Sequence, residues 1–176
     1  MTRVERTQAL IKELPRIYPD AHCELDFKTP LQLLLATILS AQCTDKRVNL
    51  VTPGLFKTYR TAADFAAAEP AKLEKEIQST GFFRNKARSI RAAAAAIENE
   101  HGGKVPQTMA KLHALPGVGR KTANVVLGNA FQIDEGIVVD THVARLSERP
   151  GLTKQTDAAT SERDTMKHVP PAHATM

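Results

Sequence analysis

The sequence predicts an all-α protein, and three observations lead to that fold class. Apolar residues recur at three- and four-residue spacing along most of the 176 residues. The alternating pattern typical of a strand is confined to residues 137–139. Aromatic residues make up only 5% of the chain and Trp is absent, whereas alanine is abundant, which favours closely packed helices over a sheet.

Helices are expected first at 2–17, 30–42, 45–59, 71–79 and 86–100, with a short alanine-rich turn after Thr61. Pro30 suits the first position of its helix, and the run of leucines that follows it predicts the central core helix. Pro15 is expected to kink or end the first helix and Pro53 to interrupt the third. Thr44 or Asp45 is the expected cap of that third helix.

The second half predicts a helix–turn–helix arrangement over 106–131, followed by a loop at 132–139. Asp140 or Thr141 then caps a helix that turns Val143 and Leu146 inward and ends at 150–151. A weak helix is expected around 157–168, with a loose end at 169–176.

The turn at 116–119 is the feature around which the chain is organised. Gly117 and Gly119 permit positive φ and leave backbone N–H groups uncovered, while Val118 between them is expected to point inward. These donors lie just before a helix N-terminus, which makes a site suited to a phosphate oxygen. Such turns also serve simply as connectors, and that alternative stays open here.

The net charge of +5 is unevenly spread, since residues 81–149 carry 10 Lys and Arg against 6 Asp and Glu. This excess surrounds the glycine turn, where a polyanion would bind. A solvated basic surface explains the charge equally well.

Lys121 and Asp140 are the candidate catalytic residues. A helix N-terminus, the neighbouring Arg120 and a cleft would each favour the uncharged, nucleophilic amine of Lys121, although a lysine that contacts phosphate would fit there equally well. Asp140 precedes a helix and would make a good N-cap, yet a capping carboxylate can still face a cleft. An amine and a carboxylate above a phosphate site suggest imine chemistry on a nucleic-acid sugar.

No run reaches eighteen apolar residues and the N-terminus has no apolar signal region, so we expect a protein that is neither membrane-spanning nor secreted. Cys23 and Cys43, twenty residues apart, lack metal-ligand spacing and are expected to be buried thiols in a reducing compartment.

Residues 115–123 (LPGVGRKTA) and 139–143 (VDTHV) resemble the signature of the endonuclease III family of DNA glycosylases, as do residues 39–45 (LSAQCTD) and 79–83 (STGFF). The resemblance covers most of residues 1–152. It implies a two-lobed helix-hairpin-helix fold, with a central lobe at 22–135 and a second lobe formed by 1–21 and 136–176.

The resemblance also implies an activity and a set of roles. Lys121 would attack C1′ of the damaged nucleotide, expel the base and form a Schiff base, after which β-elimination nicks the strand; Asp140 would be the catalytic aspartate. Oxidised pyrimidines would be the usual substrates. The residues expected to contact DNA are Gln42, which would fill the gap left by the flipped nucleotide, Phe82 as a wedge in the opposite strand, Gly117, Val118, Gly119, Arg120 and Arg145.

The expected partner is double-stranded DNA with a damaged base or an abasic site, bound by a monomer in the cytoplasm, at the nucleoid, or in another DNA-containing compartment. Family members can hold a monovalent cation on the hairpin carbonyls. They typically carry a [4Fe–4S] cluster on four C-terminal cysteines, whereas this chain has no cysteine after Cys43. The cluster is therefore expected only in a full-length form, with the second lobe incomplete here. A non-catalytic DNA-binding module and a monofunctional glycosylase are the alternatives.

Overall fold

The structure, a computed structural model, describes residues 2–133, 135–139, 141–149, 151–153, 155 and 157–169, without the side chains of residues 141, 142, 144, 158 and 159. Its elements are α1 (Arg3–Ile17), α2 (Pro30–Ser40), α3 (Asp45–Thr58), α4 (Ala62–Ala66), α5 (Pro70–Ile77), η1 (Gln78–Thr80), α6 (Phe83–His101), α7 (Met109–His113), α8 (Arg120–Val126), the π-helical η2 (Leu127–Phe131), α9 (Thr141–Glu148) and α10 (Ala158–Met166). The described residues include no strand, which confirms the all-α prediction.

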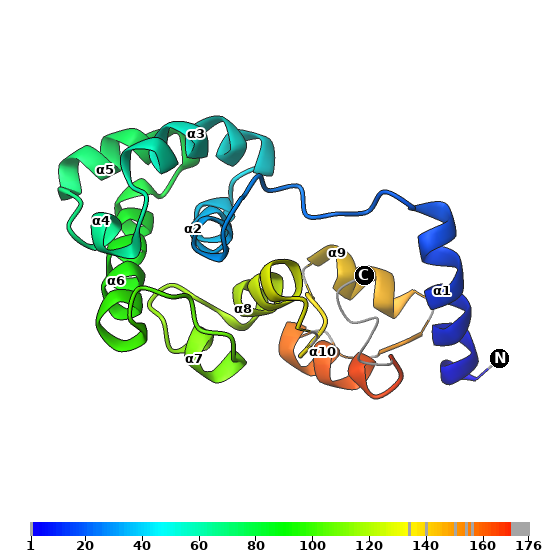
Figure 1. The fold of residues 1–176 in the computed structure, drawn as a ribbon. Helices are drawn as coiled ribbons and strands as arrows, with labels where there is room; N and C mark the ends of the chain where they lie inside the picture. The colour runs from blue at the N-terminus through cyan, green and yellow to red at the C-terminus, as the bar shows by residue number, and fades with distance from the viewer. Residues whose placement is uncertain are drawn as a thin grey trace.

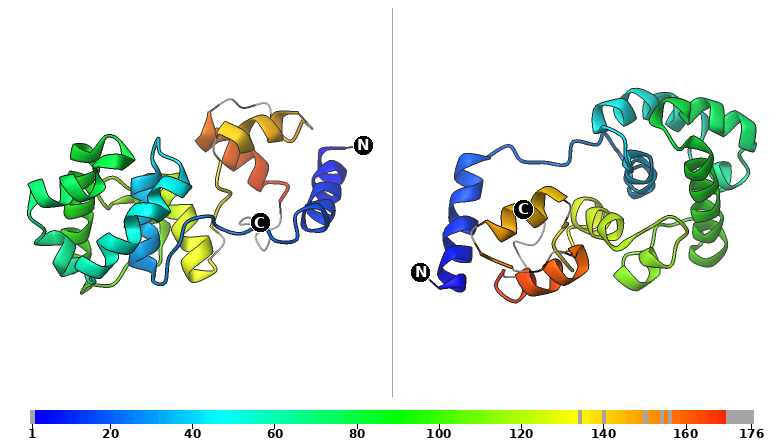
Figure 2. Two further views of the ribbon diagram at one scale, coloured as in Figure 1. Left: turned by 90° about the horizontal axis from the view of Figure 1, so that it is seen from above. Right: turned by 180° about the vertical axis from the view of Figure 1, so that it is seen from behind.

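Helices α2 to η2 gather into one part of the molecule, here called the hairpin lobe, whereas α1, α9 and α10 lie together in a second part, the terminal lobe (Figure 1). An extended segment after α1 crosses from the terminal lobe to the start of α2, and the views from above and behind show the same separation (Figure 2). Thus the first and the last two described helices share one lobe, while the middle of the chain forms the other.

Helix α2 is the centre of the hairpin lobe, as its sequence predicted. Thr29 caps it by accepting a hydrogen bond from the Gln32 amide, and Pro30 occupies the first turn. Four of its five leucines (Leu33, Leu34, Leu35 and Leu39) and Ala36 are completely buried, and it packs against α3, α6 and α8. Burial on all sides explains why this helix is apolar nearly all round.

Local capping fixes where most other helices begin. Thr44 accepts a hydrogen bond from the Arg47 amide at the start of α3, and Thr61 forms a reciprocal capping box with Asp64 at the start of α4. Asp157 caps α10 in the same way. The weak helix predicted near 157–168 is therefore real, and a side chain of its own begins it.

Three sequence predictions about the helices were wrong. Helix α1 continues past Pro15 to Ile17, and α3 continues past Pro53 to Thr58, so neither proline ends its helix. Leu146 was expected to point inward, but 61% of its surface is exposed. Within the described part of the chain, no helix is both long and apolar enough to cross a membrane.

Candidate active site

The glycine turn connects α7 to α8 and is held from inside by apolar side chains. Leu112, Leu115 and Val118 are buried, and the Val118 amide donates to the Leu115 carbonyl at 3.1 Å. The inward position predicted for Val118 is confirmed. The apolar side chains therefore occupy one side of the turn, and its backbone is left for the other side.

The two glycines of the turn differ in why they are needed. Gly117 has φ +77°, and a Cβ atom there would lie 2.6 Å from the Cβ of Ser89 on α6, so both conformation and space require glycine. Gly119 has φ −83° and would place a Cβ in open space. Gly119 therefore does not use the positive φ that glycine permits; it leaves the backbone uncovered just before α8.

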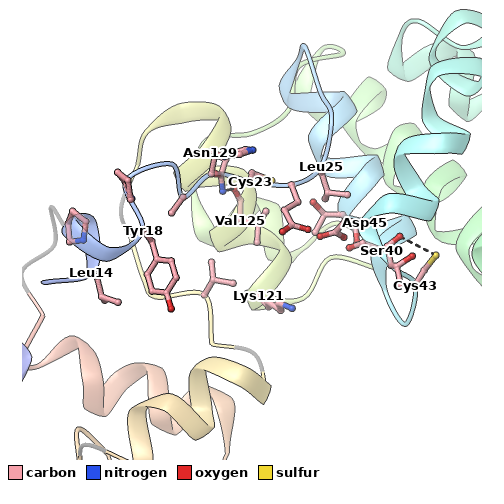
Figure 3. Close-up of a pocket in the computed structure, with 18 residues that line it drawn as sticks. Leu14, Tyr18, Cys23, Leu25, Ser40, Cys43, Asp45, Lys121, Val125 and Asn129 are labelled. Carbon is pink, nitrogen blue, oxygen red and sulfur yellow. Dashed lines mark hydrogen bonds between the residues drawn. The ribbon is translucent and has the colours of Figure 1, made fainter. Parts of the chain in front are cut away.

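Lys121, in the first turn of α8, lines a cavity of about 990 Å³. Ser40, Cys43 and Asp45 line the same cavity from the end of α2 and the start of α3 (Figure 3). Burial raises the pKa of the Asp45 carboxyl, the neighbouring Glu24 raises it further, and the nearby Lys121 ammonium lowers it. The cavity thus brings an amine and a carboxyl within electrostatic reach of each other.

Both lobes contribute to this cavity. Leu14 and Tyr18 of α1 line it on one side, opposite Lys121 and Asp45 of the hairpin lobe (Figure 3). Val138, in the segment that leads to α9, lines it as well. A substrate group in the cavity would therefore be enclosed between the lobes.

The proximity predicted for Lys121 and Asp140 is not tested, because Asp140 lies outside the described residues. Asp45 is the carboxyl that sequence analysis missed as a site residue, having been assigned only a capping role. Its position beside the abrupt change from apolar to polar residues after α2 was the available signal.

Arg120 pairs with a carboxylate of the terminal lobe. Its guanidinium forms a two-point ion pair with Glu162 of α10, with Nε–Oε2 at 2.7 Å and a second nitrogen–oxygen distance of 3.1 Å. Glu162 is buried and also accepts a hydrogen bond from the Asn124 amide at 2.9 Å. The hydrogen bonds that Arg120 donates to Glu162 raise the pKa of Arg120. Arg120 therefore joins the start of α8 to α10, and its contact with DNA stays a prediction.

Gln42 and Phe82 share an uncommon backbone conformation. Both are exposed residues with positive φ, +52° and +46°, in the loops after α2 and η1. Such a conformation costs a residue other than glycine about 1–3 kcal/mol and is typical of functional sites. Arg145 is likewise exposed, on α9.

The two cysteines do not match the predicted burial. Cys23 and Cys43 are free and only partly buried, and both line the cavity. A [4Fe–4S] cluster takes four thiolate ligands, so these two thiols do not fit one. Among the described residues, no three His, Cys, Asp or Glu side chains are grouped so as to hold a metal ion.

The fold and the site define a class of protein, the base-excision DNA repair proteins. The family described as "HhH-GPD superfamily base excision DNA repair protein" matches residues 35–171. The endonuclease III of Synechocystis is 54% identical over 96% of this chain and 77% of its own length.

Two solved structures are similar over 99% of this chain and 82% of theirs, each at 43% identity. One is a non-covalent endonuclease III–DNA complex, with a TM-score of 0.93, and the other is a trapped covalent endonuclease III–DNA intermediate, with a TM-score of 0.92. The chain belongs to the endonuclease III family, and the resemblance found in its sequence is confirmed.

Proposed function

We propose that this protein is a base-excision DNA glycosylase with abasic-site lyase activity, which removes oxidised or otherwise damaged pyrimidines from duplex DNA. The observation that carries the proposal is the position of Lys121. Its amine lies at the start of the hairpin helix, in the wall of a large cavity that also contains the Asp45 carboxyl. Family membership and the covalent DNA intermediate of a relative support the same chemistry.

In the proposed reaction, the lone pair of Lys121 Nζ attacks C1′ of an extruded nucleotide. The bond from C1′ to the base breaks, and the base leaves with its electron pair and takes up a proton. The sugar ring then opens as the C1′–O4′ bond breaks, giving a protonated imine between Lys121 and C1′. Loss of a proton from C2′ and cleavage of the C3′–O bond release the 3′ phosphate and nick the strand.

Two carboxyls are assigned roles around this amine. Asp140 would stabilise the positive charge that develops at the sugar as the base departs. Asp45, whose pKa is raised by burial and by Glu24, is suited to accept and return the protons that leave and re-enter Lys121.

The hairpin and the exposed loops would hold the duplex. The backbone amides of Gly117 and Gly119 would bind a phosphate oxygen, since the Val118 amide already donates to Leu115, and the hairpin carbonyls would bind a monovalent cation. Gln42 would fill the gap left by the extruded nucleotide and Phe82 would wedge into the opposite strand, while Arg145 contacts the DNA backbone. The protein would act as a monomer on damaged DNA.

Borohydride trapping on a duplex with one abasic site tests the proposal. We expect the wild-type chain to form a covalent adduct and to nick the strand, and Lys121→Gln to do neither. An adduct that persists in Lys121→Gln would contradict the role of Lys121. Release of a damaged base without any adduct would indicate a monofunctional glycosylase, and DNA binding alone a non-catalytic module.

A further inference from the structure

A buried lysine, Lys86 of α6, connects the two loops that carry the strained residues. Only 5% of Lys86 is exposed. Its Nζ atom donates hydrogen bonds to the carbonyls of Leu39 and Thr80, both at 2.7 Å. One amine thus holds two segments that are 41 residues apart in the sequence.

Both carbonyls belong to the ends of helices. Leu39 lies in the last turn of α2 and Thr80 ends η1. Carbonyls at such ends have no partner within their own helix, so a donor from elsewhere must satisfy them when they are buried. Lys86 supplies both bonds, and the rigid 19-residue helix α6 holds its backbone in place.

Each carbonyl lies just before one of the residues with positive φ. Gln42 follows Leu39 by three residues, and Phe82 follows Thr80 by two. Phe82 is 64% exposed and Gln42 is exposed as well, so neither side chain is held by the core. Their directions therefore depend on how the ends of α2 and η1 are fixed.

Lys86 differs from a lysine in an ordinary ion pair. Its two hydrogen-bond partners are backbone carbonyls rather than carboxylates, and burial lowers its pKa. An apolar residue of the same length would avoid the desolvation of the ammonium. The hydrogen bonds to the two carbonyls offset this desolvation, and they hold the carbonyls at a fixed distance from each other.

We infer that Lys86 is a positioning residue for nucleotide extrusion: it sets the spacing between the loops of Gln42 and Phe82, so that Gln42 reaches the gap left by the extruded nucleotide while Phe82 enters the opposite strand. The inference rests on the proposed function, because it requires that these two residues act on DNA. Lys86 itself would touch neither the DNA nor the reacting sugar.

The test compares three variants on one abasic-site duplex that carries 2-aminopurine beside the site, whose fluorescence rises on unstacking. Lys86→Met removes the donor and keeps an unbranched apolar side chain that is one atom shorter, whereas Lys86→Arg keeps donors. Ile97→Ala is the control: it is fully buried on the same helix, eleven residues beyond Lys86, and destabilises the core. All are assayed at a temperature where each is folded.

We expect Lys86→Met to lower the single-turnover nicking rate at least tenfold and to abolish the rise in fluorescence. Ile97→Ala should stay within twofold of the wild type, and Lys86→Arg should recover part of the loss. If Lys86→Met does not fold, Lys86→Gln replaces it under the same criteria, because its amide nitrogen is one bond closer to the backbone and cannot hold both carbonyls.

Nicking by Lys86→Met within twofold of Ile97→Ala, with the fluorescence rise intact, would overturn the inference while leaving the proposed function in place. A wild-type chain that gives neither adduct nor nick would overturn the proposed function and the inference together. A wild-type chain that nicks without any rise in fluorescence would overturn the inference alone.

Discussion

At the scale of single residues, the two glycines of the hairpin provide a matched pair for mutation. Gly117→Ala would force a side chain into positive φ and place its Cβ 2.6 Å from that of Ser89. We expect a loss of about 2–5 kcal/mol in the free energy of unfolding, from the left-handed conformation and the overlap together. Urea denaturation measures this loss.

Gly119→Ala is the control for that measurement, because its φ of −83° suits any residue and no atom lies within 4 Å of the added Cβ. The loss in the free energy of unfolding should stay below about 1 kcal/mol, because alanine is only a weaker N-cap residue than glycine. Equal losses in the two variants would show that the turn is not held in the conformation described here.

At the scale of elements, substitutions in the short loop from η1 to α6 should change stability and activity in opposite directions. Phe82 has φ +46° and is 64% exposed, so its ring contributes little to the core while its backbone is strained. We expect Phe82→Gly to raise the free energy of unfolding by about 1 kcal/mol, since glycine adopts positive φ without strain. The same change should slow nicking of an abasic duplex, because the wedge is lost.

Phe82→Ala separates the two effects, since it also removes the ring but keeps a side chain at positive φ. Its nicking rate should fall with that of Phe82→Gly, whereas its stability should not rise. Full nicking activity in both variants would remove Phe82 from the DNA-contacting set.

The helices show what sequence pattern can and cannot predict. Periodicity and caps located α2, α3 and α10, because those signals lie within each helix. Proline was a poorer guide: α1 and α3 continue past Pro15 and Pro53, since a proline removes only its own N–H donor from a helix. The site was likewise predictable only where the signal is local. Motif spacing indicated the hairpin and Lys121, but the presence of Asp45 in the same cavity depends on how α3 packs.

At the scale of the whole molecule, helical spacing reveals an apolar face but not what covers it. The face of α1 is apolar as its sequence predicts, yet Leu14, Ile17 and Tyr18 are 43%, 55% and 63% exposed. Leu14 and Tyr18 instead form part of the cavity wall. A long-range ion pair was equally unpredictable, since Arg120 and Glu162 are 42 residues apart and nothing in their local sequences pairs them.

That ion pair joins the terminal lobe to the helix that carries Lys121. Glu162 is buried, and its carboxylate accepts hydrogen bonds from the side chains of Arg120 and Asn124. The carboxylate also lies so close to Gly136 that a Cβ atom there would overlap it. Arg120→Met would leave a buried carboxylate without its cation, so we expect a loss of about 3 kcal/mol in the free energy of unfolding. The double variant Arg120→Met/Glu162→Met should recover most of that loss, because it removes both charges.

The exposed pair between Arg16 and Glu13 is the control, where Arg16→Met should cost less than about 1 kcal/mol. The ion pair between Arg120 and Glu162 should also affect activity, because it fixes α8 against the terminal lobe. The double variant should fold well and still trap abasic DNA more slowly than the wild type, because the Lys121 amine is less firmly placed. Additive losses in Arg120→Met, Glu162→Met and the double variant, with trapping unchanged, would show that the two lobes are held together elsewhere.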